Sequence, residues 1–226
     1  MTRTHEIRPD LDEGIDRKVL GQLRARFLKL NEGRMARAME GLSTRQQGVL
    51  TLLPLFFHVN HPLLPGYVSG STPAGLSNFE PDANALAEAQ RLTRSFSYKP
   101  RHGSNPPRPI HGLFLMGSLG TLAQADQSDM DVWVCHAPDL SESELNELRK
   151  KCQLLETWAA SQGAEAHFFL IDPARFVLGE RDTQLSSEDC GTTQHYLLLD
   201  EFYRTAIWLA GRTPIWWLVP VYEEAA

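Results

Sequence analysis

Cysteine is scarce in this sequence, and long hydrophobic runs are missing. The three cysteines, Cys135, Cys152 and Cys190, cannot all pair, and none has a partner at the spacing of a zinc knuckle. We therefore expect free thiols in a reducing compartment. The longest apolar run, LLPLFF at 52–57, is far too short to span a bilayer, and the N-terminal MTRTHEIRPDLDEG has no apolar signal region. Both features predict a cytoplasmic protein without a transmembrane segment.

An excess of positive charge is also lacking. The chain has 22 Lys and Arg against 28 Asp and Glu, which gives a net charge of −6. This balance argues against a surface that binds nucleic acid, although a local positive patch could still bind a small anion such as a nucleoside triphosphate. The 226 residues, 42% of them hydrophobic, are enough to bury a sizeable core in one large domain or two small ones.

The sequence changes in character near residue 100, which predicts an N-terminal helical region over 1–100. Between residues 10 and 41 apolar residues recur at helical spacing, which places Leu20, Leu23, Phe27 and Leu30 on one face. A second helix is expected from Ser43 and a third over 82–94. The proline-rich, glycine-containing and basic stretch SYKPRHGSNPPRP at 97–109 indicates an exposed connection.

Residues 101–226 alternate between strand and helix patterns. Strands are expected at IHGLFLMG, MDVWVCH and AEAHFFLID, with an amphipathic helix over 141–163 before the third. QHYLLLDEFYRTAIWLAG at 194–211 is expected to form a further helix that stops at a glycine. The pattern predicts an α/β architecture for this half, and the family resemblance given below implies a mixed sheet with flanking helices.

Two acids occupy one face of the strand that begins near residue 130. Because side chains alternate along a strand, Asp129 and Asp131 project to one face while Met130 projects to the other. Two such carboxylates repel each other unless a cation neutralises them, and oxygen ligands of this kind suit Mg²⁺. A glycine and a serine, Gly117 and Ser118, end the preceding strand, where a backbone can approach a phosphate closely. The arrangement predicts a site for a metal-bound triphosphate.

These residues carry a family resemblance. GS followed by SDMDVW resembles the nucleotidyltransferase superfamily typified by DNA polymerase beta. LLPLFFHVNHPLLPGY, SDMDVWVCH, KCQLLETWAASQGAEAHFFLID and EDCGTTQHYLLLDEFYRTAIWLAG resemble the N-terminal catalytic region of the class I adenylate cyclases of bacteria. The resemblance runs from about residue 17 to 224. It implies a polymerase-beta-like nucleotidyltransferase core and conversion of ATP to 3′,5′-cyclic AMP and pyrophosphate with two Mg²⁺ ions, or Mn²⁺ in their place.

The resemblance also implies roles for single residues. Asp129 and Asp131 match the metal ligands, Gly117 and Ser118 match the phosphate-binding turn, and Ser128 is assigned to cofactor binding with them. The superfamily adds a third catalytic acid on a following strand. Glu165 is preferred because it lies early in its strand between small apolar residues. Asp172, at the other end of that strand, is the alternative, and it could equally be a turn residue before Pro173.

Other functions are also compatible with the sequence. The same site could transfer a nucleotidyl group to a protein or small-molecule hydroxyl, or the chain could be a catalytically silent nucleotide-binding or docking fragment. His195 could face an anion at a helix start, but capping by a neighbouring threonine accounts for the same residues. Asp200, Glu201 and Arg204 have the spacing of a solvated ion-pair face, and PIWWLVP is expected in the core or an interface.

The resemblance has a consequence for the extent of the chain. The family continues beyond this region, so we expect a fragment or a shortened relative whose core is truncated at its C-terminal end. A C-terminal regulatory region and a regulatory protein partner are implied by the family. ATP is the expected substrate.

Overall fold

A computed structural model of the chain describes residues 17–100, 108–121, 123–124, 128–177 and 200–214. Its elements, in chain order, are α1 (Arg17–Glu40), α2 (Thr44–His58), α3 (Ala83–Leu92), β1 (Ile110–Met116), β2 (Met130–His136), α4 (Glu142–Ser161), β3 (Ala166–Ile171), α5 (Pro173–Val177) and β4 (Ile207–Gly211). Residues 200–205 are also helical. No helix in these ranges is long and apolar enough to cross a bilayer.

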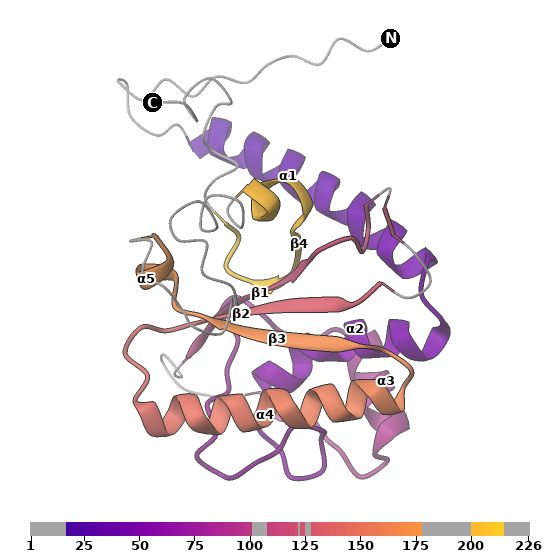
Figure 1. Cartoon of the computed structure of the whole chain (residues 1–226), viewed down its shortest axis with the longest axis vertical. Coiled ribbons are helices and arrows are strands. Elements are labelled where there is room, and N and C mark those ends of the chain that lie inside the picture. The colour runs from indigo at the N-terminus through magenta and orange to yellow at the C-terminus, as the bar shows by residue number, and fades with distance from the viewer. Residues whose placement is uncertain (1–16, 101–107, 122, 125–127, 178–199, 215–226) are drawn as a thin grey trace, which may run out of the picture.

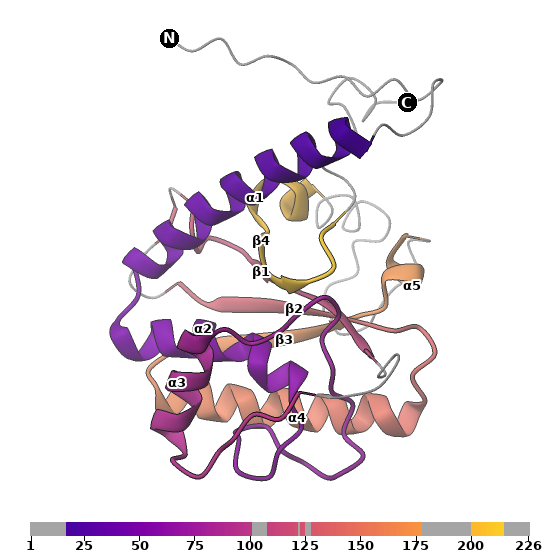
Figure 2. The same cartoon turned by 180° about the vertical axis from the view of Figure 1, so that it is seen from behind.

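The four strands form one mixed sheet in the order β3-β2-β1-β4. β1 runs antiparallel to both β2 and β4, whereas β2 and β3 are parallel. Figures 1 and 2 show α2, α3 and α4 on one side of the sheet and α1 on the other, alongside β4. The expected α/β class, a mixed sheet with flanking helices, is therefore confirmed.

Two of the helices begin at the serines that mark them in the sequence. Ser43 caps α2: its side chain accepts a bond from the Gln46 N–H, and the Gln46 side chain accepts one from the Ser43 N–H at 2.9 Å. Ser141 and Glu144 form the same reciprocal pair at the start of α4. Such capping boxes satisfy two N–H groups that a helix terminus otherwise leaves unpaired, which explains why these boundaries were predictable.

The alternation along β2 divides the molecule into two apolar clusters. Val132 and Val134 face the larger cluster, where they pack with residues of α2 and α4 such as Phe57 and Leu155. Trp133 faces the opposite side, in a smaller cluster with Phe114, Met116, Ile171 and Ala206. The larger cluster holds residues from both sides of residue 100, and the domain boundary expected there stays a prediction.

The last strand of the sheet lies where the sequence predicts a helix. The helix expected over 194–211 is wrong for Ile207–Gly211, which pair antiparallel with β1 as β4. Helical structure is described only for 200–205, and residues 194–199 lie outside the described part of the chain. The reason is tertiary: the free edge of β1 offers backbone partners, and IWLAG carries β-branched and aromatic residues that suit a strand.

α1 packs against the outer edge of β4 through hydrogen bonds. The Asn31 amide donates to the Trp208 carbonyl at 2.9 Å and accepts from the Trp208 N–H at 2.7 Å. Arg34 donates to the carbonyls of Ala206 and Arg204 at 3.1 and 2.7 Å. These side chains satisfy the unpaired backbone of an edge strand. The face expected to be apolar is only partly buried as a result: Phe27 is 7% exposed but Leu30 is 54% exposed.

One cation is buried on the α4 side of the sheet. Lys151 is 1% exposed, its Nζ donates to the Gly66 carbonyl at 3.3 Å, and it lies 5.9 Å from the centre of the Phe57 ring. Burial lowers the pKa of Lys151 from 10.5 to about 8. Below pH 8 the lysine is charged in both the folded and unfolded states, so the folded protein bears the full cost of a buried charge.

We expect Lys151→Met to raise the free energy of unfolding at pH 7, because the buried charge costs on the order of 3 kcal/mol, against about 1 kcal/mol for the lost hydrogen bond. The cost falls as pH rises from 8 to 10.5 and disappears where both states are neutral. Urea unfolding of both proteins at pH 7 and pH 10.5 measures the difference. A gain that is equal at the two pH values would contradict the role of charge.

Candidate active site

The turn after β1 is formed by the glycine and serine singled out in the sequence. Gly117 has a φ of +85°, a conformation that side-chain-bearing residues rarely adopt. A Cβ at this position would lie 3.5 Å from the Asp131 Oδ2 atom. The glycine therefore leaves the space beside the Asp131 carboxylate open.

The serines on either side of this turn are in contact. Ser118 Oγ donates to Ser128 Oγ at 2.8 Å, which ties the end of β1 to the residue before the two acids. The Ser118 carbonyl accepts bonds from the Thr121 N–H and hydroxyl at 3.0 and 2.6 Å. The structure thus brings together Gly117, Ser118 and Ser128, the three residues assigned to phosphate or cofactor binding.

The candidate acids lie at the starts of two neighbouring parallel strands, with Asp131 in β2 and with Asp129 and Glu165 just before β2 and β3. Met130 N–H donates to the Glu165 carbonyl at 2.9 Å, and Asp131 is paired with His167 in the register of β2 and β3. Residues paired in this way project to the same face of a sheet, as do residues two positions away. Ligand atoms of Asp129, Glu165 and His167 all lie within 4.8 Å of one another, in a group that could hold a metal ion.

Asp131 is the half-buried member of the site. Burial raises the pKa of the Asp131 carboxyl, His167 lowers it, and the carboxylates of Asp129 and Glu165 raise it again. A bound cation would reduce the repulsion among these nearby carboxylates. Asp131 is not a member of the group of ligand atoms formed by Asp129, Glu165 and His167, but the charges of all three residues act on its carboxyl.

Asp172, the alternative third acid, lies at the other end of β3 and has a different set of contacts. Its Oδ1 accepts bonds from the N–H groups of Ala174 and Arg175 at 2.9 and 3.4 Å, at the start of α5. These are the bonds of an N-cap residue. The structure brings Glu165 to Asp129 and does not bring Asp172 into that group.

His167 was missed by the sequence analysis. Its Nε2 lies 3.5 Å from Glu165 Oε1, and its side chain is 48% exposed. The signal was present in the EAH of the third strand, because residues 165 and 167 share a face once the segment is a strand. What the sequence could not supply is the parallel pairing with β2, which brings that face beside the acids.

Aromatic residues cover the same face of the sheet next to the acids. Trp133 stacks on Phe202 with ring centres 5.5 Å apart and an angle of 16° between the planes. Phe176 packs edge-on against Trp133 at 5.4 Å. The Arg204 and Asp200 pair is exposed with its atoms 2.8 Å apart, as expected of a solvated ion pair. His195 and residues 215–220 lie outside the described ranges.

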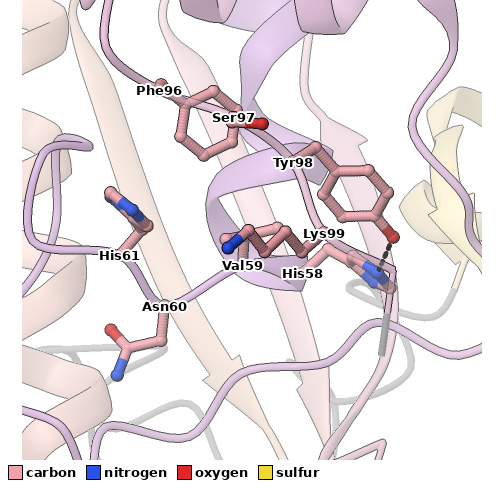
Figure 3. Close-up of a pocket in the computed structure, with 8 residues that line it drawn as sticks. All are labelled: His58, Val59, Asn60, His61, Phe96, Ser97, Tyr98 and Lys99. Carbon is pink, nitrogen blue, oxygen red and sulfur yellow. Dashed lines mark hydrogen bonds between the residues drawn. The ribbon is translucent and has the colours of Figure 1, made fainter. Parts of the chain in front are cut away.

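A separate cavity of about 270 Å³ lies at the end of α2. Figure 3 shows the eight residues that line it, His58, Val59, Asn60, His61, Phe96, Ser97, Tyr98 and Lys99. None of the candidate site residues is among them. His58 and Tyr98 are joined by a hydrogen bond of 3.2 Å across its wall. Cys135 and Cys152 are free thiols, as expected, and Cys190 lies outside the described residues.

The class of protein follows from comparison with known families. The family described as "Adenylate cyclase NT domain" matches residues 19–217. This match covers most of the chain, which therefore belongs to that family, the N-terminal region of the class I bacterial adenylate cyclases.

Several curated relatives are similar over the same region. Adenylate cyclases of Salmonella typhimurium and Escherichia coli K12 are each 44% identical over 207 residues, which cover 89% of this chain and 24% of the relative. That of Proteus mirabilis is 42% identical over 203 residues, which cover 89% of the chain and 23% of the relative. The chain thus spans about a quarter of the length of these relatives. No solved structure matches it.

Proposed function

We propose that this chain has the nucleotidyltransferase core of an adenylate cyclase and converts ATP to 3′,5′-cyclic AMP and pyrophosphate. The observation that carries the proposal is the meeting of Asp129 and Glu165 at the starts of two adjacent parallel strands, with Asp131 two residues further along and the Gly117 turn beside the Asp131 carboxylate. Membership of the adenylate cyclase family supports the choice of reaction. We place the protein in the cytoplasm, and regulation by a C-terminal region or a protein partner stays a prediction.

The donor set fits the two Mg²⁺ ions that we assign to the site. Carboxylate oxygens from Asp129, Asp131 and Glu165 are hard ligands of the kind Mg²⁺ prefers. When bound, Mg²⁺ offsets triphosphate charge and makes the ribose 3′-hydroxyl easier to deprotonate. Asp129 and Asp131 would hold the metal ions that offset the charge of the triphosphate. Glu165 would hold the ion that makes the ribose 3′-hydroxyl easier to deprotonate.

The remaining site residues bind and orient the nucleotide. Ser118 and the open space at Gly117 receive the phosphates, with Ser128 held against Ser118 by their hydrogen bond. The 3′-oxygen forms a bond to the α-phosphorus and loses its proton to solvent water. The bond from that phosphorus to the oxygen bridging to the β-phosphate breaks, which releases pyrophosphate.

Incubation of the chain with ATP and Mg²⁺ tests the proposal. Cyclic AMP formed without any added acceptor is the expected product, detected by chromatography against authentic cyclic AMP. If the nucleotidyl group is instead transferred to an added hydroxyl acceptor, the chain is a nucleotidyltransferase and not a cyclase. Binding of ATP with Mg²⁺ but no product would indicate a silent nucleotide-binding fragment.

Gly117→Val is expected to weaken ATP binding by about tenfold or more. The branched side chain would occupy the space beside Asp131 Oδ2, and the positive φ of residue 117 is unfavourable for valine. Calorimetry with ATP and Mg²⁺ measures the change. Gly163→Val is the matched control, since Gly163 also has a positive φ, of +78°, but no atom lies within 4 Å of its Cβ position. Equal ATP affinities in the two variants would remove Gly117 from the phosphate site.

A further inference from the structure

His167 lies beside the proposed site of three carboxylates but has no role in it. It lies on β3 opposite Asp131 in the strand register, and its ring belongs to the same group of ligand atoms as Asp129 and Glu165. Phe168, the next residue, donates its N–H to Glu156 of α4 at 3.2 Å, which helps to fix this part of the edge strand. The imidazole is therefore held beside the acids by the backbone of β3.

We propose that His167 is a nitrogen ligand of one of the metal ions and makes this position favour Mn²⁺ over Mg²⁺. The inference rests on the proposed function, because it assigns a metal preference to the same site. It adds a residue and a selectivity that the three acids alone do not provide.

The distances suit a shared ion. Ligand atoms each about 2.1 Å from an octahedral metal are about 3 Å apart when adjacent and about 4.2 Å apart when opposite. His167 Nε2 and Glu165 Oε1 are 3.5 Å apart, and all three ligand atoms lie within 4.8 Å of one another. Side-chain rotation can bring the three ligand atoms to coordination distance. All three residues are exposed and free to make that adjustment.

The chemistry of the ligand set determines which ion it favours. Mg²⁺ prefers oxygen ligands and gives up its waters reluctantly, whereas imidazole nitrogen suits transition-metal ions. A site of two carboxylates and one imidazole therefore binds Mn²⁺ more tightly than a site of oxygen atoms alone, relative to Mg²⁺. The competing interpretation is a simple ion pair between His167 and Glu165, which needs no metal and predicts no such preference.

Mn²⁺ itself is the probe, because its electron paramagnetic resonance reports both binding and ligand type. We would titrate the chain with Mn²⁺ alone, follow the signal of the free ion, and then compete with Mg²⁺. His167→Ala is expected to raise the dissociation constant for Mn²⁺ about tenfold while that for Mg²⁺ changes less than about twofold. His61→Ala is the control, since His61 lines the separate cavity of Figure 3.

A pulsed measurement on the unaltered chain gives a second test that needs no variant. Modulation of the bound Mn²⁺ signal by imidazole nitrogen is expected in the wild type and in His61→Ala, and its loss is expected in His167→Ala. Bound Mn²⁺ without nitrogen modulation overturns the inference. If Asp129→Asn still removes Mn²⁺ binding in that case, the proposed metal site stands without His167. If Mn²⁺ binds with no dependence on Asp129, both proposals fail.

Discussion

Asp131→Asn is expected to reduce cyclic AMP formation by about a thousandfold or more while the protein stays folded. Asparagine has nearly the same shape but lacks the negative charge through which Asp131 is proposed to hold the metal ions. The half-buried carboxylate is also repelled by Asp129 and Glu165 and disfavoured by burial, so its removal should leave the free energy of unfolding unchanged or higher. Asp129→Asn is expected to have the same effect on turnover.

The measurements separate lost chemistry from lost structure. Turnover is followed as cyclic AMP produced from ATP and Mg²⁺, and stability is followed by urea unfolding at the same pH. Asp139→Asn makes the same change of charge beyond the opposite end of β2, where Asp139 is exposed, and should keep full activity. Mg²⁺-dependent binding of ATP provides a second readout that does not require turnover. Wild-type activity in the Asp131→Asn variant would exclude Asp131 as a metal ligand.

Glu165→Gln is expected to lower kcat by about a hundredfold and to leave KM for ATP nearly unchanged. In the proposed mechanism the triphosphate is held mainly through Asp129, Asp131 and the Gly117 turn, and Glu165 is assigned to the side of the ribose hydroxyl. A residue that acts in the chemical step more than in binding reduces kcat selectively. Initial rates over a range of ATP concentrations at saturating Mg²⁺ measure the two constants.

Asp172→Asn serves as the paired control for Glu165→Gln. Asp172 caps α5 through the Ala174 N–H, and asparagine caps a helix about as well as aspartate, so both activity and stability should stay close to wild type. If Asp172→Asn is the variant that loses turnover and Glu165→Gln keeps it, the third acid has been assigned to the wrong end of β3.

Much of the site was predictable because the evidence for it is local. The alternation of Asp129 and Asp131 around Met130, and a glycine at the end of the preceding strand, both depend on residues close together in sequence. The starts of α2 and α4 are equally local, since each is fixed by a serine and the side chain three residues later. These features need no knowledge of which strands become neighbours.

The predictions that failed depend on distant contacts. Ile207–Gly211 became a strand because β1 has a free edge, and Leu30 is exposed because α1 contacts β4 through Asn31 and Arg34. His167 joins the acids only through the parallel pairing of β2 and β3. Neither hydrophobic periodicity nor local propensity contains that information, since tertiary pairing can override both.

The contact between Asn31 and Trp208 has a consequence for the order in which the molecule is completed. The two residues are 177 positions apart, so at about 5 to 20 residues per second the ribosome makes β4 about 10 to 35 s after α1. During that interval α1 has no strand edge to bind. Its buried set is small, Phe27, Asn31 and Ala38, and its sequence is rich in arginine and lysine, which keeps a waiting helix soluble. Among the described helices, α1 comes earliest in the sequence and is therefore expected to be among the last to become fixed.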